Sequence, residues 1–224
     1  MLEAAGAAAV TAVCRVWALL PDRGNGVTGI DKRVVPGPVR VHPMGLHGDV
    51  QVDRKWHGGP DQAVYVYADE DADWFARELG REIPPGLFGE NLRIRGLDVS
   101  GAVIGERWRI GAKAVFEVTL PRVPCGTFAR RMAVPGWVDR FTDYGAPGAY
   151  LRVVRTGELA RGDRVQVLSR PEHGVTIGEW FRHAAARDAT TLLDAAAEGQ
   201  FTVAPELVRM AQHSLRKATR TPVR

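Results

Sequence analysis

The chain has 224 residues, 45% of them hydrophobic and 25% charged, which is the composition of a globular protein with enough mass for its own core. Thirty Lys and Arg residues against 26 Asp and Glu give a net charge of +4, and the basic residues are scattered among acidic ones, so no nucleic-acid partner is expected. No stretch approaches the ~20 apolar residues that a membrane-spanning helix needs, so no membrane partner is expected either. The two cysteines, Cys14 and Cys125, are too few for a disulfide framework, which predicts free thiols and a cytoplasmic location.

The first 170 residues have the pattern of a strand-rich domain. Residues 1–10 are rich in alanine and are predicted to form a flexible lead-in, and the dense apolar run at residues 11–20 predicts a buried first strand. Residues 34–41 contain two prolines, which restricts them to an edge strand or an extended arm. Frequent Gly and Pro residues separate further short apolar runs, which predict strands at residues 50–53, 63–67, 92–94, 103–104, 107–110, 114–120, 149–154 and 164–168.

Helices are predicted at one place inside this domain and at three places after it. Residues 69–79 begin with acidic residues, carry an apolar side and stop at Gly80. Beyond Pro171 glycine becomes rare and alanine rises, and Thr176 with Glu179 forms a capping-box pattern. The sequence therefore predicts a mainly β fold with α (α+β), in which a β-rich domain at residues 11–170 is followed by a three-helix segment at residues 171–224, with helices at 176–186, 190–197 and 205–217.

Cys125 is the first candidate for chemistry. It follows the strongest predicted strand in the run Pro121-Arg122-Val123-Pro124-Cys125, where two prolines restrict the backbone and Arg122 supplies positive charge. Positive charge favours the thiolate, which is the form that ligates metals or attacks electrophiles. The alternative, that Cys125 is a small buried hydrophobe, stays open at this point; for Cys14, inside an apolar strand, packing is the preferred interpretation.

A second cluster, between His47 and Asp61, is rich in His, Asp and Gly. It is compatible with a Zn or Fe site, with a glycine-rich turn at Gly58 and Gly59 whose amides hold an anion, or with an ordinary loop. A third motif, Phe88-Gly89-Glu90-Asn91, either positions a polar ligand or forms a turn closed by Glu90 or Asn91. No serine-hydrolase, P-loop, zincin, thiol-redox or Rossmann motif is present.

Taken together and in this order, the motifs resemble the MOSC domain family, named for the C-terminal domain of molybdenum-cofactor sulfurase. The resemblance is to the stand-alone bacterial branch that includes the 6-N-hydroxylaminopurine resistance protein. The matching segments are His47-Gly48-Asp49 through Asp53-Arg54, His57-Gly58-Gly59-Pro60-Asp61, Phe88-Gly89-Glu90-Asn91-Leu92, Pro121 to Cys125, and Gly148 to Val153. In this chain Gln62 stands where relatives commonly carry a basic residue.

The resemblance implies a distorted β-barrel with a short helical segment after it, and a molybdenum cofactor (Mo-molybdopterin) whose metal is ligated by Cys125. Molybdenum is thiophilic, and the pterin supplies two further sulfurs. Cys125 and His57 are the candidate catalytic residues, and the choice between His57 and Glu90 as the group that relays a proton stays open. The residues expected to contact the cofactor are Arg54, Lys55, Gly58, Gly59, Asn91, Arg122 and Thr127.

The function that the resemblance implies is reduction of the N–O bond of a small N-hydroxylated compound. The chain holds no flavin, haem or iron–sulfur motif, so the electrons are expected from a separate reductase. A sulfur carrier with a persulfide on Cys125 and a binding module with a vestigial pocket are the alternatives. A homodimer is left open.

Overall fold

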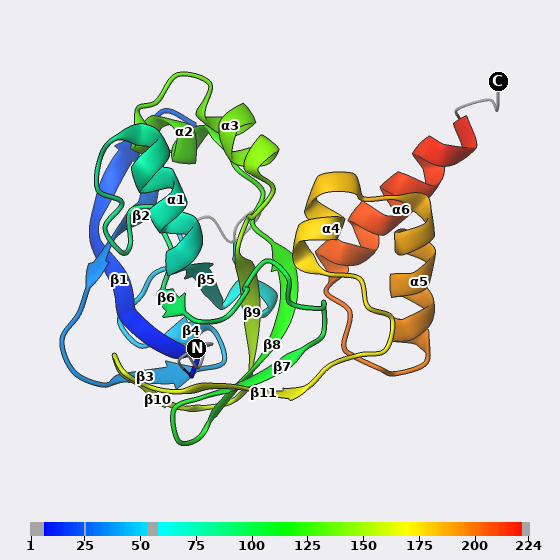
Figure 1. The fold of residues 1–224 in the computed structure, drawn as a ribbon, viewed down its shortest axis with the longest axis horizontal. Helices are drawn as coiled ribbons and strands as arrows, with labels where there is room; N and C mark the ends of the chain where they lie inside the picture. Colours follow the sequence, from blue (N-terminus) through cyan, green and yellow to red (C-terminus); the bar gives the residue numbers. More distant parts are fainter. Residues whose placement is uncertain (1–6, 25, 53–57, 221–224) are drawn as a thin grey trace, which may run out of the picture.

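The computed structural model describes residues 7–24, 26–52 and 58–220, apart from the side chain of residue 220 (Figure 1). Eleven strands lie in the described part of the chain up to residue 169, and three helices follow at the C-terminal end, as the sequence predicts. The strands are β1 (Ala9–Asp22), β2 (Gly26–Val34), β3 (Val39–His42), β4 (Gly45–Leu46), β5 (Val64–Ala68), β6 (Leu92–Arg95), β7 (Arg107–Ile110), β8 (Ala114–Pro121), β9 (Ala149–Arg155), β10 (Gly157–Leu159) and β11 (Val165–Ser169).

Eight of the strands form one sheet in the order β11-β7-β8-β9-β5-β6-β1-β2, and β10-β3-β4 form a second, smaller sheet. All pairs are antiparallel except β5 with β6. The large sheet does not close into a continuous barrel. It curls far enough that residues 8–10, at the start of β1, exchange backbone hydrogen bonds with residues 162–165, next to β11.

Several predicted boundaries differ from those observed. β1 already begins at Ala9, inside the expected lead-in, because the sheet needs Ala9 and Val10 as partners for β6 and for residue 164. Of the strand predicted at 50–53, Val50, Gln51 and Val52 lie in a loop, and residue 53 lies outside the described residues. Val103 forms only an isolated bridge.

Helix α1 (Asp69–Leu79) lies where the sequence predicts it and packs on β5 and β6. A 3₁₀ turn, η1 (Pro60–Gln62), precedes β5. Two further helices, α2 (Gly126–Met132) and α3 (Trp137–Tyr144), are not predicted from the sequence. They are short, and they are held by apolar side chains that enter an aromatic core shared with α1: Phe75, Phe88, Phe128, Met132, Trp137 and Phe141.

The C-terminal segment consists of α4 (Ile177–His183), α5 (Ala186–Ala197) and α6 (Pro205–Arg220), which lie together beside the sheet (Figure 1). Thr176 and Glu179 form the predicted capping box at the start of α4. Trp180 of α4 and Leu207 of α6 are fully buried in the same hydrophobic core as strands β5 and β8. None of the described helices is both long and apolar enough to span a membrane.

Candidate functional site

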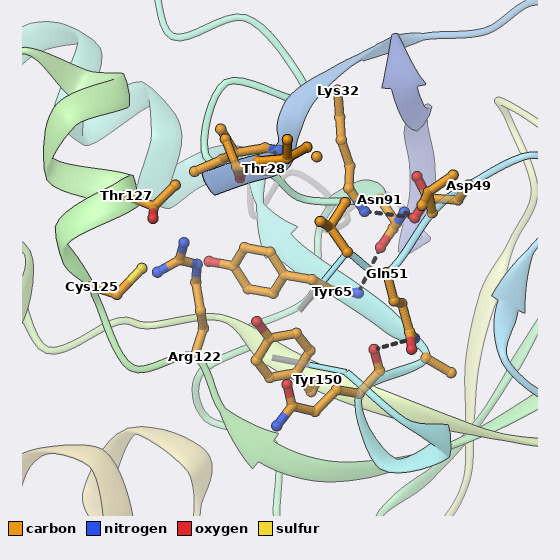
Figure 2. A pocket seen from close by; sticks show the side chains of 18 residues that line it. Thr28, Lys32, Asp49, Gln51, Tyr65, Asn91, Arg122, Cys125, Thr127 and Tyr150 are labelled. Atoms are coloured by element: carbon orange, nitrogen blue, oxygen red, sulfur yellow. Dashed lines mark hydrogen bonds and ion pairs between the residues drawn. The ribbon is translucent and has the colours of Figure 1, made fainter. Parts of the chain in front are cut away.

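A pocket of about 130 Å³ opens at the surface where β2, β5, β9, the loop before η1 and the chain that follows β8 meet. Its side-chain groups fall into two sets (Figure 2). Cys125, Arg122 and Thr127 lie on one side, Lys32, Asp49 and Asn91 lie on the other, and the rings of Tyr65 and Tyr150 stand between them. The pocket is lined by Val27, Thr28, Gly29, Ile30, Lys32, Asp49, Val50, Gln51, Val52, Gln62, Ala63, Tyr65, Gly89, Asn91, Arg122, Cys125, Thr127 and Tyr150.

Cys125 lies at the junction between the chain that leaves β8 and the first residue of α2. Its backbone is extended, with φ −133° and ψ 172°, and its carbonyl accepts the first hydrogen bond of the helix from Ala129. The side chain is half-buried and forms no disulfide. Cys125 is therefore an accessible thiol, whereas burial raises the pKa of the fully buried Cys14 to about 12 and keeps it protonated.

Arg122 supplies a buried positive charge next to this thiol. Its guanidinium lies 4.0 Å from the ring centre of Phe128 and 5.5 Å from that of Tyr65, and it donates a hydrogen bond to the carbonyl of Val123. Cation–π contacts with buried rings stabilise a guanidinium in this setting. In Figure 2 its charged end is directed toward the side of the pocket that holds Cys125.

Lys32 and Asp49 form an ion pair on the opposite wall. The ammonium Nζ lies 2.7 Å from Asp49 Oδ2, and the two side chains are only 12% and 8% exposed. Asp49 Oδ1 also accepts a hydrogen bond from the amide of Val16 at 2.8 Å. The pair joins β1, β2 and the loop after β4, so its position is fixed by three separate segments.

Asn91 lies in the pocket wall, but its side chain is committed to the protein. Its Nδ2 donates to Asp49 Oδ2 at 2.8 Å and to the carbonyl of Cys14 at 3.3 Å, and its Oδ1 accepts from the amide of Tyr65 at 3.1 Å. The neighbouring Glu90 closes the turn before it by accepting from the amides of Gly86 and Phe88. In the third motif Glu90 therefore closes the turn, as the second interpretation predicts. Asn91 lines the pocket and also holds β1, β5 and the Asp49 loop together through its side-chain hydrogen bonds.

The loop that carries Gly59 is held by Gln51. Gln51 Oε1 accepts from the amide of Gly59 at 2.8 Å, and its Nε2 donates to the carbonyls of Met44, Gly59 and Gln62. The Gly59 amide is thus already used within the protein, and neither Gly58 nor Gly59 lines the pocket. Gln62 does line it, and its buried Oε1 has no hydrogen-bond partner among the residues described.

Thr127 lies at the edge of the thiol side, where its hydroxyl donates to Asp22 at 3.1 Å. Arg54, Lys55 and His57 lie outside the described residues. Within the described part of the chain no group of His, Cys, Asp and Glu side chains could hold a metal ion. The two described carboxylates of the His47–Asp61 cluster pair with cations instead, Asp49 with Lys32 and Asp61 with Arg152.

Sequence reasoning missed Lys32, Tyr65, Gln62 and Tyr150 as pocket residues. A signal for Lys32 was available, because alternate residues of a strand face the same side, and Thr28, Ile30 and Lys32 of β2 all line the pocket. Tyr65 forms a buried part of the pocket wall. Its hydroxyl donates to the carbonyl of Pro147, and burial raises the pKa of this hydroxyl well above the usual value. Burial also raises the pKa of Tyr150.

Known proteins match both the sequence and the fold. The MOSC domain model matches residues 53–166. The uncharacterized protein YflK of Bacillus subtilis is 36% identical over 67% of this chain and 67% of its own, and protein YiiM of Escherichia coli is 31% identical over 64% of this chain and 65% of its own. A protein named Reductase from Gibberella moniliformis is 32% identical over 66% of this chain, but the match spans only 27% of that relative.

The solved structures of YiiM have the same fold. The protein from Geobacillus stearothermophilus superposes with a TM-score of 0.76 over 93% of this chain and 99% of its own, at 23% identity. The structure from Escherichia coli gives a TM-score of 0.70 over 94% of each chain, at 21% identity. These likenesses extend through the C-terminal helices, and together with the sequence matches they identify the chain as a member of the MOSC domain family.

Proposed function

We propose that this chain binds a molybdenum cofactor through Cys125 and reduces N-hydroxylated compounds in the cytoplasm, with electrons from a separate reductase. The observation that carries the proposal is the pocket itself, in which a half-buried thiol and a buried guanidinium line one cavity of a MOSC-family chain. The reaction adds two electrons and two protons to an N–OH group, breaks the N–O bond, and releases an amine and water.

The donor set of the pocket fits such a cofactor. A thiolate is a soft ligand that suits a thiophilic metal, and Arg122 favours that thiolate by its charge. Gln62 Oε1, the buried acceptor without a partner in the described structure, is suited to an N–H group of a pterin ring.

When bound, the cofactor supplies two-electron chemistry that no amino-acid side chain provides. The chain's own residues would hold and orient the reactants. Cys125 would ligate the metal, Arg122 would keep positive charge next to it, and the rings of Tyr65 and Tyr150 would line the space between Cys125 and the opposite wall. The relative named Reductase supports an oxidoreductase activity, although this chain corresponds to about a quarter of that protein.

Production in a host that makes the molybdenum cofactor tests this function. The wild-type chain is expected to carry molybdenum and pterin, and to reduce 6-N-hydroxylaminopurine when reduced viologen supplies the electrons. Cys125→Ser is expected to abolish the activity. Cys14→Ala is the matched control, because the Cys14 thiol is buried and held protonated, and it is expected to keep both metal and activity.

Wild-type protein without molybdenum or pterin, and without turnover, would contradict the proposal. Mass spectrometry then decides the alternative: a labile extra sulfur on Cys125 in the absence of pterin would identify a sulfur carrier. Activity that survives Cys125→Ser would instead remove the thiol from the mechanism.

A further inference from the structure

Lys32 is a charged pocket residue that the function proposed above does not use. Its ammonium is nearly buried, with 12% of the side chain exposed, and it lies on the wall opposite Cys125 (Figure 2). An ammonium carries three N–H donors and no acceptor. Asp49 takes one of them, at 2.7 Å.

The other two donors of Lys32 have no acceptor within the described structure. Because the ammonium lines the pocket, these two donors are available to a bound molecule. Two other donors of the same pocket, on Tyr65 and Asn91, are already engaged. The Tyr65 hydroxyl donates to Pro147, and the Asn91 amide donates to Asp49 and Cys14.

The structure also fixes the Lys32 ammonium in place. Asp49, its anchor, is held by the amide of Val16 and by Asn91. On the other side the backbone of β2 is in close contact with Gly86, where an added Cβ would come within 2.3 Å of the Lys32 carbonyl oxygen. Gly86 has φ +88°, a conformation that favours glycine, so the approach depends on this residue. A rigidly held donor binds a ligand with less loss of entropy.

The charge of this wall selects the kind of acceptor. Asp49 cancels the formal charge of Lys32, so the pair together is neutral, and a doubly charged phosphate would gain little from it. A neutral oxygen is better suited, because it needs a hydrogen-bond donor and no net charge in order to bind, and the ammonium would also stabilise negative charge that develops on it during the reaction. The oxygen of an N–OH group has this property, since it leaves as water when the N–O bond breaks.

We propose that Lys32, held by Asp49, binds the oxygen atom of the N-hydroxylated substrate and so determines the preference of the pocket for the N–OH compound over its amine product. The inference rests on the proposed function, and it has Lys32 hold the N–OH oxygen in the pocket space that faces the thiol.

Binding without turnover tests the inference. The molybdenum-loaded chain is kept without any electron donor, and calorimetry measures the dissociation constants of 6-N-hydroxylaminopurine and of adenine, the amine product. The wild type is expected to prefer the N–OH compound. Lys32→Met is expected to lower that preference roughly 10- to 100-fold, as a lost hydrogen bond to a charged group predicts, while adenine binding stays unchanged. Lys32→Arg keeps the charge and the N–H donors and is expected to retain the preference.

Lys32→Met leaves Asp49 without its cation, so Lys32→Gln, whose amide still donates to Asp49, serves as a second variant if the first does not fold. Folding of each variant is checked by thermal unfolding, and molybdenum content is measured for each. A preference that is absent in the wild type, or unchanged in Lys32→Met or Lys32→Gln, would overturn the inference. Equal weakening of both compounds would show a structural role, and loss of molybdenum with an intact preference would show a cofactor contact; either result also contradicts it.

The two proposals fail separately. Wild-type protein without molybdenum or N–O reduction refutes the proposed function. A functional, molybdenum-loaded wild type whose preference does not depend on Lys32 refutes only the role of Lys32.

Discussion

Asn91 gives a sharp quantitative prediction, because its side chain joins three backbone segments behind the pocket. Asn91→Ala removes the acceptor of the Tyr65 amide and the donor to the Cys14 carbonyl. Both residues are buried, at 3% and 0% exposure. At about 2 kcal/mol for each buried group left without this partner, the variant loses about 4 kcal/mol of unfolding free energy.

For a chain of this length that loss lowers the melting temperature by roughly 10 °C. Urea unfolding monitored by circular dichroism measures the free energy, and calorimetry measures the melting temperature. A loss of less than about 1 kcal/mol of unfolding free energy, which is no more than one ordinary hydrogen bond contributes, would refute the conclusion that the Asn91 side chain holds these segments together.

Asn91→Asp tests the same geometry with a side chain of equal size. It keeps the acceptor for Tyr65 and places a second carboxylate where Nδ2 now lies 2.8 Å from Asp49 Oδ2. Two carboxylates at this distance share a proton, so their pKa in the folded state is raised above the unfolded value. The folded variant then binds more protons than the unfolded one, and its stability falls as the pH rises through the raised pKa. Unfolding in urea at pH 5 and pH 8 is expected to show the variant closer to wild type at pH 5; an equal deficit at both values would contradict the contact.

Three further predictions concern other parts of the molecule. Arg122→Met is expected to slow alkylation of Cys125 by iodoacetamide at pH 7 roughly 3- to 10-fold, because the nearby cation on the same side of the pocket favours the thiolate. Mass spectrometry measures the rate, and an unchanged rate would show that Arg122 does not influence the thiol. Burial raises the pKa of Asp71 from 3.8 to about 6, so the folded state binds a proton more tightly than the unfolded state and wild-type stability falls as the pH rises through this range. Asp71→Asn removes this titration and is expected to raise the free energy of unfolding in urea by roughly 1–3 kcal/mol at pH 8 and by much less at pH 4. An equal effect at both pH values would refute the pKa shift. A chain that ends at residue 170 is expected to lose its cooperative thermal transition, because α4–α6 share one hydrophobic core with the sheet; an unchanged transition would show that the helices are a separate unit.

Strong local patterns were sufficient to predict much of the fold. Helix α1 has acidic residues in its first turn and a terminal glycine, and α4 has a capping box, so both were readable from the sequence. Helices α2 and α3 were not, because each has at most eight residues and depends on tertiary packing. The spacing of Phe128 with Met132 and of Trp137 with Phe141, four residues apart in each case, was the available signal.

The candidate site was predicted in part. Cys125, Arg122, Asn91 and Thr127 do line one pocket, but the engagement of Asn91 within the protein depends on contacts with distant residues, which a single sequence does not contain. Lys32 lies far from these motifs in the chain and reaches the pocket only through the pairing of β1 with β2 and β6. A single sequence also does not show whether the amides of a glycine-rich turn face a ligand. In the structure the amide of Gly59 donates to Gln51, and Gly59 does not line the pocket.

The ligands of the metal test the central claim most directly. X-ray absorption at the molybdenum edge counts the sulfur atoms bound to the metal in the wild-type chain and in Cys125→Ser. The account predicts three sulfurs in the wild type, two from the pterin and one from Cys125, with one fewer in the variant. The same count in both proteins, or no molybdenum in the wild type, would contradict it.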